Sequence, residues 1–332
     1  MKNSKFIFTI AVALIGLVFA SSGRSQEKLA QTGFQFLSVG TDARATAMGE
    51  AFTTVSGSPM AMFYNPAGMA VLEPFLQFSA NHMQWIADIN YFSGALSINP
   101  NQGQYGTFGL SFMFVDYGDI IGTVVAANEQ GFIETGNISP SAVAVGLGYA
   151  KAITDRFSVG GHVKYVNQSL GEPFVPETDS TQTKIDFSTD AIAFDFGTIY
   201  KTGFKSLTFG MTLRNFSQEI KFVREGFQLP LTFKIGFSIN AFDLLGAQSD
   251  NQSWLISVEA INPRAFSEYF SVGTEYKFMN RIALRGGYVY NQDDYGITTG
   301  FGVTTKKVKL DYSYTPFDVF KDVHRFSVKF GF

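Results

Sequence analysis

Leu231-Thr-Phe-Lys-Ile-Gly-Phe-Ser-Ile-Asn240 is a stretch of ten residues in which apolar side chains alternate with polar or small ones. Successive side chains of a β-strand point to opposite faces, so a strand with this pattern has one apolar face. Similar alternation occurs at 157–165 and 270–278 and continues to the final Phe332. The pattern therefore predicts amphipathic strands rather than helices.

Fourteen segments of this kind follow one another from Pro74 to the end of the chain. Each has about 9–12 residues, the length that a tilted strand needs to cross a bilayer. The predicted spans are 74–83, 90–99, 106–116, 141–152, 157–168, 190–201, 206–216, 230–241, 253–262, 268–278, 281–291, 295–304, 307–315 and 323–332. An even number of strands suits a closed bacterial barrel. We therefore expect an all-β fold, a 14-stranded antiparallel transmembrane β-barrel.

The charged residues of these segments test the prediction. Twelve of them fall on the parity opposite to the apolar residues: Lys164, Asp195, Arg214, Lys234, Glu259, Glu275, Lys277, Arg285, Lys309, Asp311, Arg325 and Lys329. A charge facing lipid at mid-membrane costs about 2–4 kcal/mol, whereas a wet lumen tolerates it. A soluble β-sandwich would also segregate charge, but we would expect a more densely charged polar face. The pattern favours a membrane barrel.

Composition agrees with export and with a membrane barrel. Charged residues make up 16% of the chain, and it contains 36 Phe and 14 Tyr. Water-soluble domains contain about 25% charged residues. The net charge is −3 and no basic cluster indicates nucleic acid. With no Cys, the chain has neither disulfides nor thiolate metal ligands.

The N-terminus has the pattern of a secretory signal peptide. Lys2 and Lys5 precede an uncharged apolar run from Phe6 to Ala20, and Val18 and Ala20 are small residues that suit a cleavage site. We expect residues 1–20 to form the signal, with cleavage between 20 and 26 and export to the outer membrane of a diderm bacterium. A retained anchor is the alternative, but a spanning helix needs about 20 apolar residues.

The links between the segments predict the topology. Links at one end are mostly very short, whereas the longest links, 118–139, 170–190 and 217–229, fall at the other end. Short periplasmic turns and longer external loops are typical of these barrels. The link at 242–252 is unusually long for an inside turn. The apolar residues in 118–139 predict either a partner surface or a loop folded onto the barrel rim.

Residues 27–73 do not alternate, and we expect them to form a small plug inside the barrel. Ala43 to Ala51 is rich in small residues and predicts a short helix. Asn65-Pro-Ala-Gly68 predicts a turn, because Pro fixes φ and Gly permits positive φ. We expect three parts in the chain: the signal at 1–20, the plug at 27–73 and the barrel at 74–332.

Gly40-Thr-Asp-Ala-Arg44-Ala-Thr-Ala-Met-Gly49, followed by Tyr64-Asn-Pro-Ala-Gly68, resembles the start of the PorV/PorQ family of FadL-like outer-membrane barrels. The resemblance extends over nearly the whole chain. It departs at Glu50, where a second Gly is common, and at Ser56-Gly-Ser58, which replaces an acidic pair. The resemblance marks Arg44, Gly49, Asn65, Pro66, Ala67 and Gly68 as motif residues.

This resemblance implies a function in type IX secretion. PorV-like members of the family carry cargo with a C-terminal sorting domain from the translocon to a surface attachment complex, and PorQ-like members belong to that complex. The expected partners are outer-membrane lipid and, by this likeness, secretion subunits or cargo sorting domains. The residues do not choose between the two branches.

Enzymatic and metal sites are not indicated. The sequence has three His, and neither His162 nor His324 lies in a catalytic signature or at metal-ligand spacing. A barrel phospholipase would need a Ser–His pair at the lipid face, whereas His162 falls on the lumen parity. We expect no enzyme activity, no cofactor and no metal.

The charges expected in the lumen allow two interpretations. Lys164, Arg214, Glu259, Glu275 and Arg285 either line a pore as a selectivity filter or pair with one another around the plug. Arg44 is expected to pair with one of the carboxylates.

Three functions remain open from the sequence alone. The first is a secretion adaptor whose external loops bind cargo or partner subunits. The second is a FadL-like transporter of hydrophobic small molecules, and the third is a general porin, which a plug at 27–73 argues against. Fold alone does not choose among them.

Overall fold

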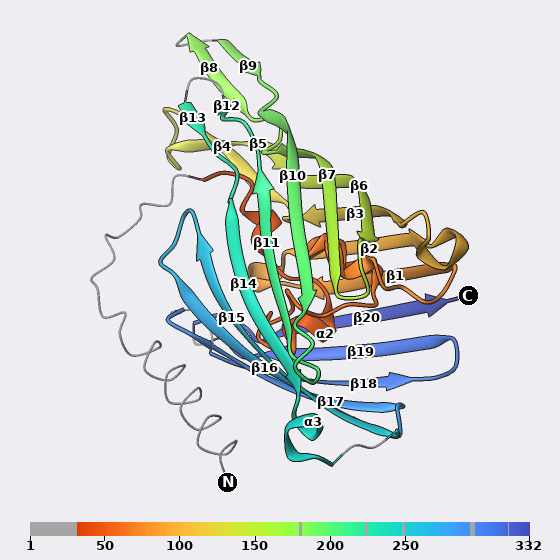
Figure 1. Ribbon diagram of the computed structural model, residues 1–332. Coiled ribbons are helices and arrows are strands. Elements are labelled where there is room, and N and C mark those ends of the chain that lie inside the picture. The colour runs from red at the N-terminus through yellow and green to blue at the C-terminus, as the bar shows by residue number, and fades with distance from the viewer. Residues whose placement is uncertain (1–31, 179–180, 223–224, 248–249, 293–295, 318) are drawn as a thin grey trace.

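The computed structural model describes residues 32–178, 181–222, 225–247, 250–292, 296–317 and 319–332, and within these ranges fourteen strands close into one antiparallel barrel (Figure 1). The predicted signal peptide at 1–20 lies outside the described residues. The barrel strands are β1 (Leu76–Gln84), β2 (Asn90–Ile98), β3 (Thr107–Asp116), β6 (Ser141–Ala152), β7 (Phe157–Ser169), β10 (Ser188–Lys201), β11 (Thr208–Phe216), β14 (Thr232–Asn240), β15 (Gln252–Pro263), β16 (Tyr269–Phe278), β17 (Ile282–Tyr290), β18 (Ile297–Thr304), β19 (Val308–Thr315) and β20 (Val323–Gly331). The predicted fold class is confirmed, and every predicted strand agrees to within two residues at each end.

The barrel closes because the last strand pairs with the first. β20 lies antiparallel to β1, and Phe78 pairs with Phe330 in the middle of this seam. At its end, the Leu76 and Phe332 backbones each donate a hydrogen bond to the other. No strand of the ring is therefore left with an unpaired edge, which a spanning sheet in lipid requires.

The alternation of buried and exposed side chains shows which face of each strand points into the lumen. In β14, Thr232, Lys234 and Ser238 are buried in the lumen, whereas Phe233 and Phe237 are exposed on the outer face. β3 alternates strictly between buried and exposed residues along its whole length. The outer face is therefore apolar, as in a barrel surrounded by lipid.

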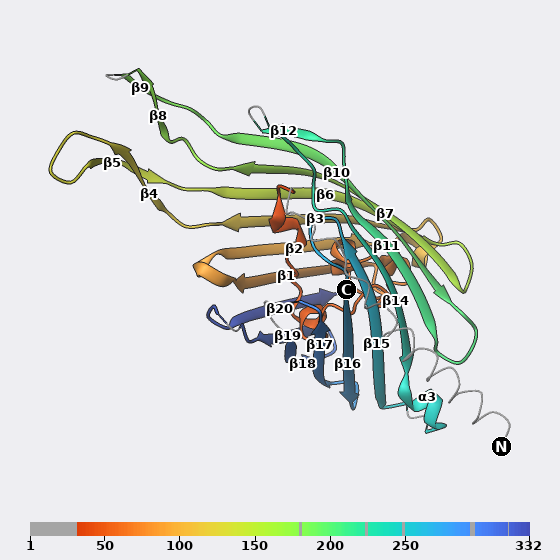
Figure 2. The same cartoon turned by 90° about the vertical axis from the view of Figure 1, so that its left-hand side faces the viewer.

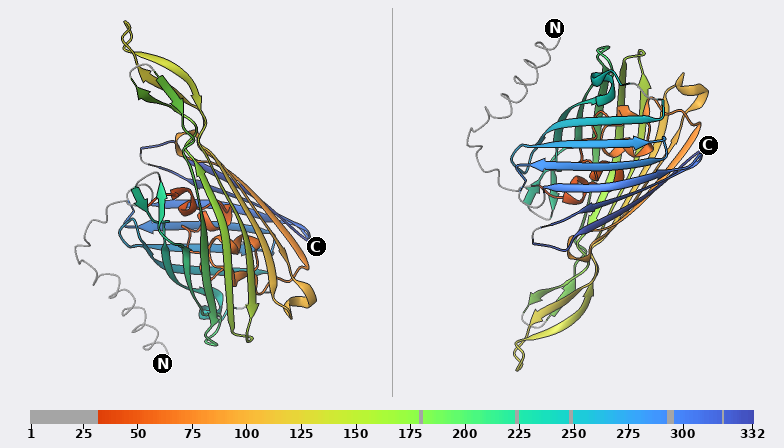
Figure 3. Two further views of the ribbon diagram at one scale, coloured as in Figure 1. Left: turned by 90° about the horizontal axis from the view of Figure 1, so that it is seen from above. Right: turned by 90° about the horizontal axis from the view of Figure 1, so that it is seen from below.

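The two ends of the barrel differ in their links. One end, here called the hairpin end, carries the two-stranded hairpins β4 (Ile120–Val125) with β5 (Phe132–Ile138), β8 (Phe174–Thr178) with β9 (Thr181–Lys184), and β12 (Ile220–Phe222) with β13 (Glu225–Phe227). Figures 2 and 3 show that β4–β5 and β8–β9 project well beyond the ring of barrel strands. The other end, called the turn end, carries the short links. The long links predicted as loops are thus built of additional strands.

The unusually long link at the turn end contains a single helical turn, α3 (Ala241–Leu245). Asn240 caps its start by accepting a hydrogen bond from the Phe242 backbone N–H, at 3.1 Å. Gly246 ends it at φ 70°, a conformation that glycine adopts at little cost. This helix accounts for the extra length of the link.

Residues 32–73 fold into short helical pieces inside the ring. These are η1 (Gln35–Ser38), α2 (Ala43–Thr46), η2 (Pro59–Phe63) and η3 (Pro66–Met69); the 3-10 helices η4 (Ile86–Asp88) and η5 (Pro100–Gly103) lie in barrel links. Both views in Figure 3 show this segment enclosed by the strands. No helix in the described ranges is both long and apolar enough to cross a bilayer.

Candidate functional site

The centre of the barrel is filled by residues 34–72, here called the plug. Phe36, Met48, Phe52 and Met60 are each at most 2% exposed. Together with inward-facing residues of the strands they form the buried apolar cluster of the molecule. The lumen at this level is therefore occupied by protein rather than by an open channel.

Inward-facing glycines on the strands make room for the plug. A Cβ on Gly160 of β7 would collide with the backbone of Pro66 and Ala67, and one on Gly287 of β17 would collide with Gly49. The plug backbone thus lies directly against the sheet at these positions. Only a residue without a side chain allows that approach.

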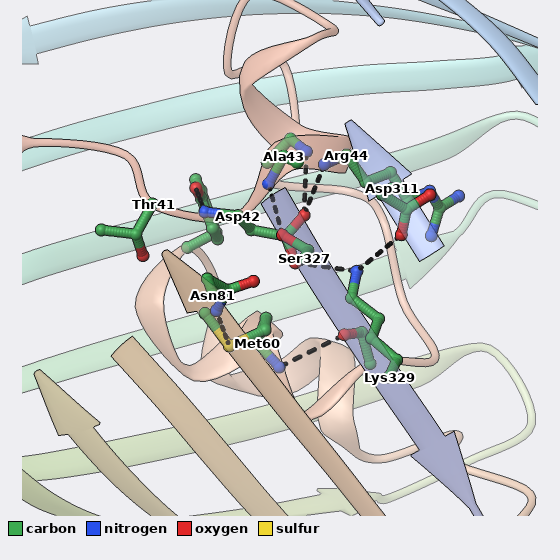
Figure 4. A network of polar contacts seen from close by, with 12 residues as sticks. Thr41, Asp42, Ala43, Arg44, Met60, Asn81, Asp311, Ser327 and Lys329 are labelled. Atoms are coloured by element: carbon green, nitrogen blue, oxygen red, sulfur yellow. Dashed lines mark hydrogen bonds and ion pairs between the residues drawn. The ribbon is translucent and has the colours of Figure 1, made fainter. Parts of the chain in front are cut away.

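The motif Thr41-Asp-Ala-Arg44 begins helix α2 and attaches it to the sheet (Figure 4). Asp42 Oδ1 accepts hydrogen bonds from the backbone N–H groups of Arg44, at 2.8 Å, and Ala45, at 3.1 Å. The Ala43 N–H donates to Ser327 Oγ on β20, at 2.8 Å. Lys329 Nζ lies 2.8 Å from Asp42 Oδ2. One aspartate therefore caps the helix and binds it to the last strand.

Arg44 pairs with Glu275 of β16, the carboxylate partner that the sequence left unidentified. Its Nε and Nη2 donate to the two Glu275 oxygens, each at 2.7 Å. Arg285 Nε donates to the same carboxylate at 2.6 Å. Burial lowers the pKa of Arg44, but the Glu275 carboxylate more than offsets this, so the pKa lies above its ordinary value. The guanidinium therefore stays charged and holds the plug to the wall.

A second attachment involves Glu259 of β15. Its carboxylate accepts a hydrogen bond from the Thr53 backbone N–H of the plug. Lys234 Nζ lies 3.9 Å from Glu259 and 3.8 Å from Glu50. Glu50 has φ 61°, the left-handed region that favours glycine. This conformation gives a physical reason for the glycine that is common at this position in the resembled family.

The motif Asn65-Pro-Ala-Gly68 forms a third attachment, and its local structure differs from the predicted turn. Residues 66–69 form the 3-10 helix η3, with Pro66 at its start and Asn65 as its cap. Asn65 Nδ2 donates to the carbonyls of Thr53 at 2.7 Å and of Thr198 on β10 at 3.1 Å. Gly68 is needed for space rather than for positive φ, because a Cβ there would lie 2.9 Å from Val55 O.

Gly49 lies where the plug meets β17 and β18. It has φ 62°, and its backbone N–H donates to Thr298 Oγ1 at 3.0 Å. A Cβ would lie 3.2 Å from the Tyr288 backbone nitrogen. Both the backbone conformation and the close approach therefore require glycine.

Lys164 and Arg214 lie in a separate buried cluster on β7, β10 and β11. Lys164 Nζ lies 2.8 Å from Asp195 Oδ2 and donates to Asn215 Oδ1 at 2.6 Å. Arg214 Nη2 donates to the Leu37 carbonyl of the plug at 3.2 Å. The five charges expected in the lumen thus all point inward and are at most 8% exposed. They pair with other residues or bind the plug.

Ser111, His162 and Asp195 form a chain of side chains that the sequence did not reveal. Ser111 Oγ lies 2.7 Å from His162 Nε2, and His162 Nδ1 lies 3.0 Å from Asp195 Oδ2. A serine hydrolase uses the same order of groups, but it needs a substrate at the serine. All three side chains are buried, and Phe63 of the plug packs edge-on against the His162 ring. The geometry therefore favours a structural hydrogen-bond chain.

His324 of β20 lies on the exposed surface, unlike His162. Its Nδ1 is 2.7 Å from the Tyr312 hydroxyl. Within the described ranges, no group of three or more His, Cys, Asp or Glu is arranged to hold a metal ion. Neither histidine therefore takes part in a recognisable catalytic or metal site among the described residues.

Several important residues were absent from the predicted site, chiefly Asp42, Thr53, Ser111 and Asp195. Asp42 has a local signal, since Asp two residues before Arg44 at the start of a small-residue helix is a typical N-cap. Thr53, Ser111 and Asp195 have no such local signal, because the residues that they contact lie far away along the chain.

Two solved structures with a similar fold are described as a hydrocarbon channel and a toluene transporter. The CymD monoaromatic hydrocarbon channel is 13% identical, with a TM-score of 0.58 over 89% of this chain and 98% of that chain. The Pseudomonas putida toluene transporter TodX is 12% identical, with a TM-score of 0.56 over 92% and 99% of the two chains. At this identity the likeness concerns the fold. Among curated proteins, none has a sequence that matches.

A family model identifies the chain more specifically. The model described as type IX secretion system protein PorV matches residues 22–260, which is more than half of the chain. The match includes the whole plug with both of its motifs and the strands from β1 to most of β15. It confirms the resemblance drawn from those motifs. The chain belongs to the PorV family of type IX secretion system proteins.

Proposed function

We propose that this protein is a non-enzymatic adaptor of the outer membrane, which binds secreted cargo or partner subunits of type IX secretion through its hairpin end. The family supports an association with this secretion system. The observation that carries the adaptor function is the apolar surface of the β4–β5 hairpin. A barrel that only anchored itself in lipid would not need such a surface beyond the membrane.

The β4–β5 hairpin exposes large apolar side chains beyond the ring of barrel strands. Val125 is 96% exposed and Ile121 is 61% exposed, and Ile120, Phe132 and Ile133 are exposed as well. The hairpin projects away from the rim rather than folding onto it (Figure 2). Exposed apolar patches of this kind commonly mark protein-binding surfaces.

The filled lumen supports binding rather than conduction. The plug is attached to the wall by Arg44, Thr53 and Asn65, and its apolar residues are buried. A general porin needs an open lumen. A FadL-like transporter of hydrophobic small molecules remains the alternative, supported by fold likeness alone. Uptake of an apolar aromatic compound that depends on this protein would favour that alternative.

The adaptor function is tested by crosslinking in the native membrane followed by purification in detergent. The variant Ile121→Asp/Val125→Asp places two charges on the hairpin surface without touching the barrel. We expect recovery of sorting-domain cargo or secretion subunits to fall at least tenfold. The matched control is Leu245→Asp, an exposed apolar residue of α3 at the opposite end. Equal recovery from both variants and the unchanged protein would contradict the proposal.

A further inference from the structure

A small recess of about 50 Å³ opens at the turn end of the barrel, between the plug and strands β16 to β20. Among the described residues, six cationic side chains line it: Arg44, Lys277, Arg281, Arg285, Lys309 and Lys329. Gly57 of the plug lies at its edge, with open space where a Cβ would stand. The recess is distinct from the hairpin surface proposed to bind partners.

The carboxylates near the recess compensate only part of this charge. Glu275 pairs with Arg44, Lys277 and Arg285, while Asp311 and Asp42 pair with Lys329. Figure 4 shows how Asp42, Lys329 and Asp311 follow one another from the plug to the wall. Six cations against these three carboxylates leave a surplus of three positive charges. Like charges held close together in a partly buried site repel one another, and an anion between them would offset that cost.

Donor groups are available for such an anion. Arg285 Nη1 lies 2.8 Å from Asp311 Oδ1, yet it is buried and makes no aligned hydrogen bond. Lys277 contacts Glu275 at 3.1 Å while 37% of its side chain is exposed toward solvent. Lys309 and Arg281 are exposed, and their side chains make no ion pair with any residue that the structure describes. Fixed Arg and mobile Lys donors around one space are the groups that bind phosphate.

We propose that this recess is a binding site for a phosphate-type oxyanion, supplied either as a free phosphate or as the headgroup of a lipid. A dianion with several acceptor oxygens matches both the charge surplus and the number of donors better than chloride does. Because Arg44 and Lys329 also hold the plug, a bound phosphate would strengthen the attachment of the plug to the wall. The proposal does not depend on the adaptor function.

The test uses the full-length protein, purified in a non-ionic detergent without phosphate. Isothermal titration with sodium phosphate should show saturable binding at one site. We expect the Lys277→Gln/Lys309→Gln variant to bind at least tenfold more weakly. Both side chains lie at the rim, so the barrel should fold, which heat-modifiable migration on gels verifies. Lys306→Gln removes an exposed charge from the neighbouring turn, outside the recess, and should bind within twofold of the unchanged protein.

A second titration distinguishes the two sources of phosphate. Short-chain phosphatidic acid below its micelle concentration should compete with phosphate if the site takes a lipid headgroup, and should not compete if it takes the free anion. Either result, together with the loss in the double variant, supports the site. Absence of saturable phosphate binding, or equal binding in all three proteins, would overturn it.

Discussion

Single residues of the plug act through contacts with strands far along the chain. Arg44 and Glu275 are 231 positions apart, yet they form a bidentate pair in which Glu275 is 1% exposed. Asp42 similarly joins a helix cap to Lys329 of the last strand. Breaking a buried pair leaves an uncompensated charge, so such residues matter more for stability than surface pairs do.

Replacing Arg44 with Met should therefore destabilise the folded barrel. We expect a loss of about 3 kcal/mol, because the plug loses its two charge-assisted hydrogen bonds to Glu275, while Arg285 and Lys277 still compensate the Glu275 charge. Guanidinium unfolding of protein refolded into lipid vesicles measures this. Lys321→Met is the control, since Lys321 pairs with Asp88 at 3.8 Å on the exposed surface. A similar loss in both variants would contradict the assignment.

Among the elements, the strand–plug interface depends on glycines that face inward. Gly160 and Gly161 are neighbours on β7 that point to opposite faces. A Cβ on Gly160 would collide with the plug backbone, whereas one on Gly161 would approach only the Asp195 carbonyl, at 3.9 Å. Two adjacent residues of one type thus have different functions, one for packing the plug and one facing outward.

Gly160→Leu should displace η3 from the wall while the barrel still forms. We expect faster proteolytic cleavage within the plug and a measurable conductance in planar bilayers. Gly161→Leu changes the same strand by the same volume and should behave like the unchanged protein. If Gly160→Leu keeps the plug protected and the channel silent, the plug is not held by this contact.

In the whole molecule, side chains are divided between an apolar outer face and a lumen filled by the plug. Phe237 of β14 is 46% exposed on the outer face, halfway along its strand, while Ser238 beside it is buried in the lumen. The hairpins at one end and the short links at the other give the barrel two different surfaces. The hairpin end corresponds to the external side expected for such barrels.

Phe237→Arg should cost about 2–4 kcal/mol, because it places a charge in the hydrocarbon layer. Phe204→Arg should cost about 0–1 kcal/mol, since the depth dependence is small near the interface. Phe204 is exposed and lies in the link between β10 and β11 at the turn end. Guanidinium titration in vesicles compares the two variants. Equal costs would show that Phe237 does not face the membrane interior.

The strands, their order along the chain and their inward and outward faces could be predicted from the sequence. Alternation is a local property: the spacing of Phe233, Ile235 and Phe237 already selects the face toward lipid. Short links between consecutive strands then make antiparallel neighbours. The N-terminal motifs were also visible, and the family match confirms the resemblance that they carry.

The partners of the inward-facing groups were decided only by the tertiary structure. Ser111, His162 and Asp195 meet because β3, β6, β7 and β10 are neighbours at one register, and Glu275 meets Arg44 because the plug lies at one height in the lumen. The cations of the recess come from the plug and from several strands, which local sequence does not relate. The alternation of residues predicts on which face of the barrel a charged side chain lies. How the barrel closes and where the plug lies inside it determine which residue that side chain contacts.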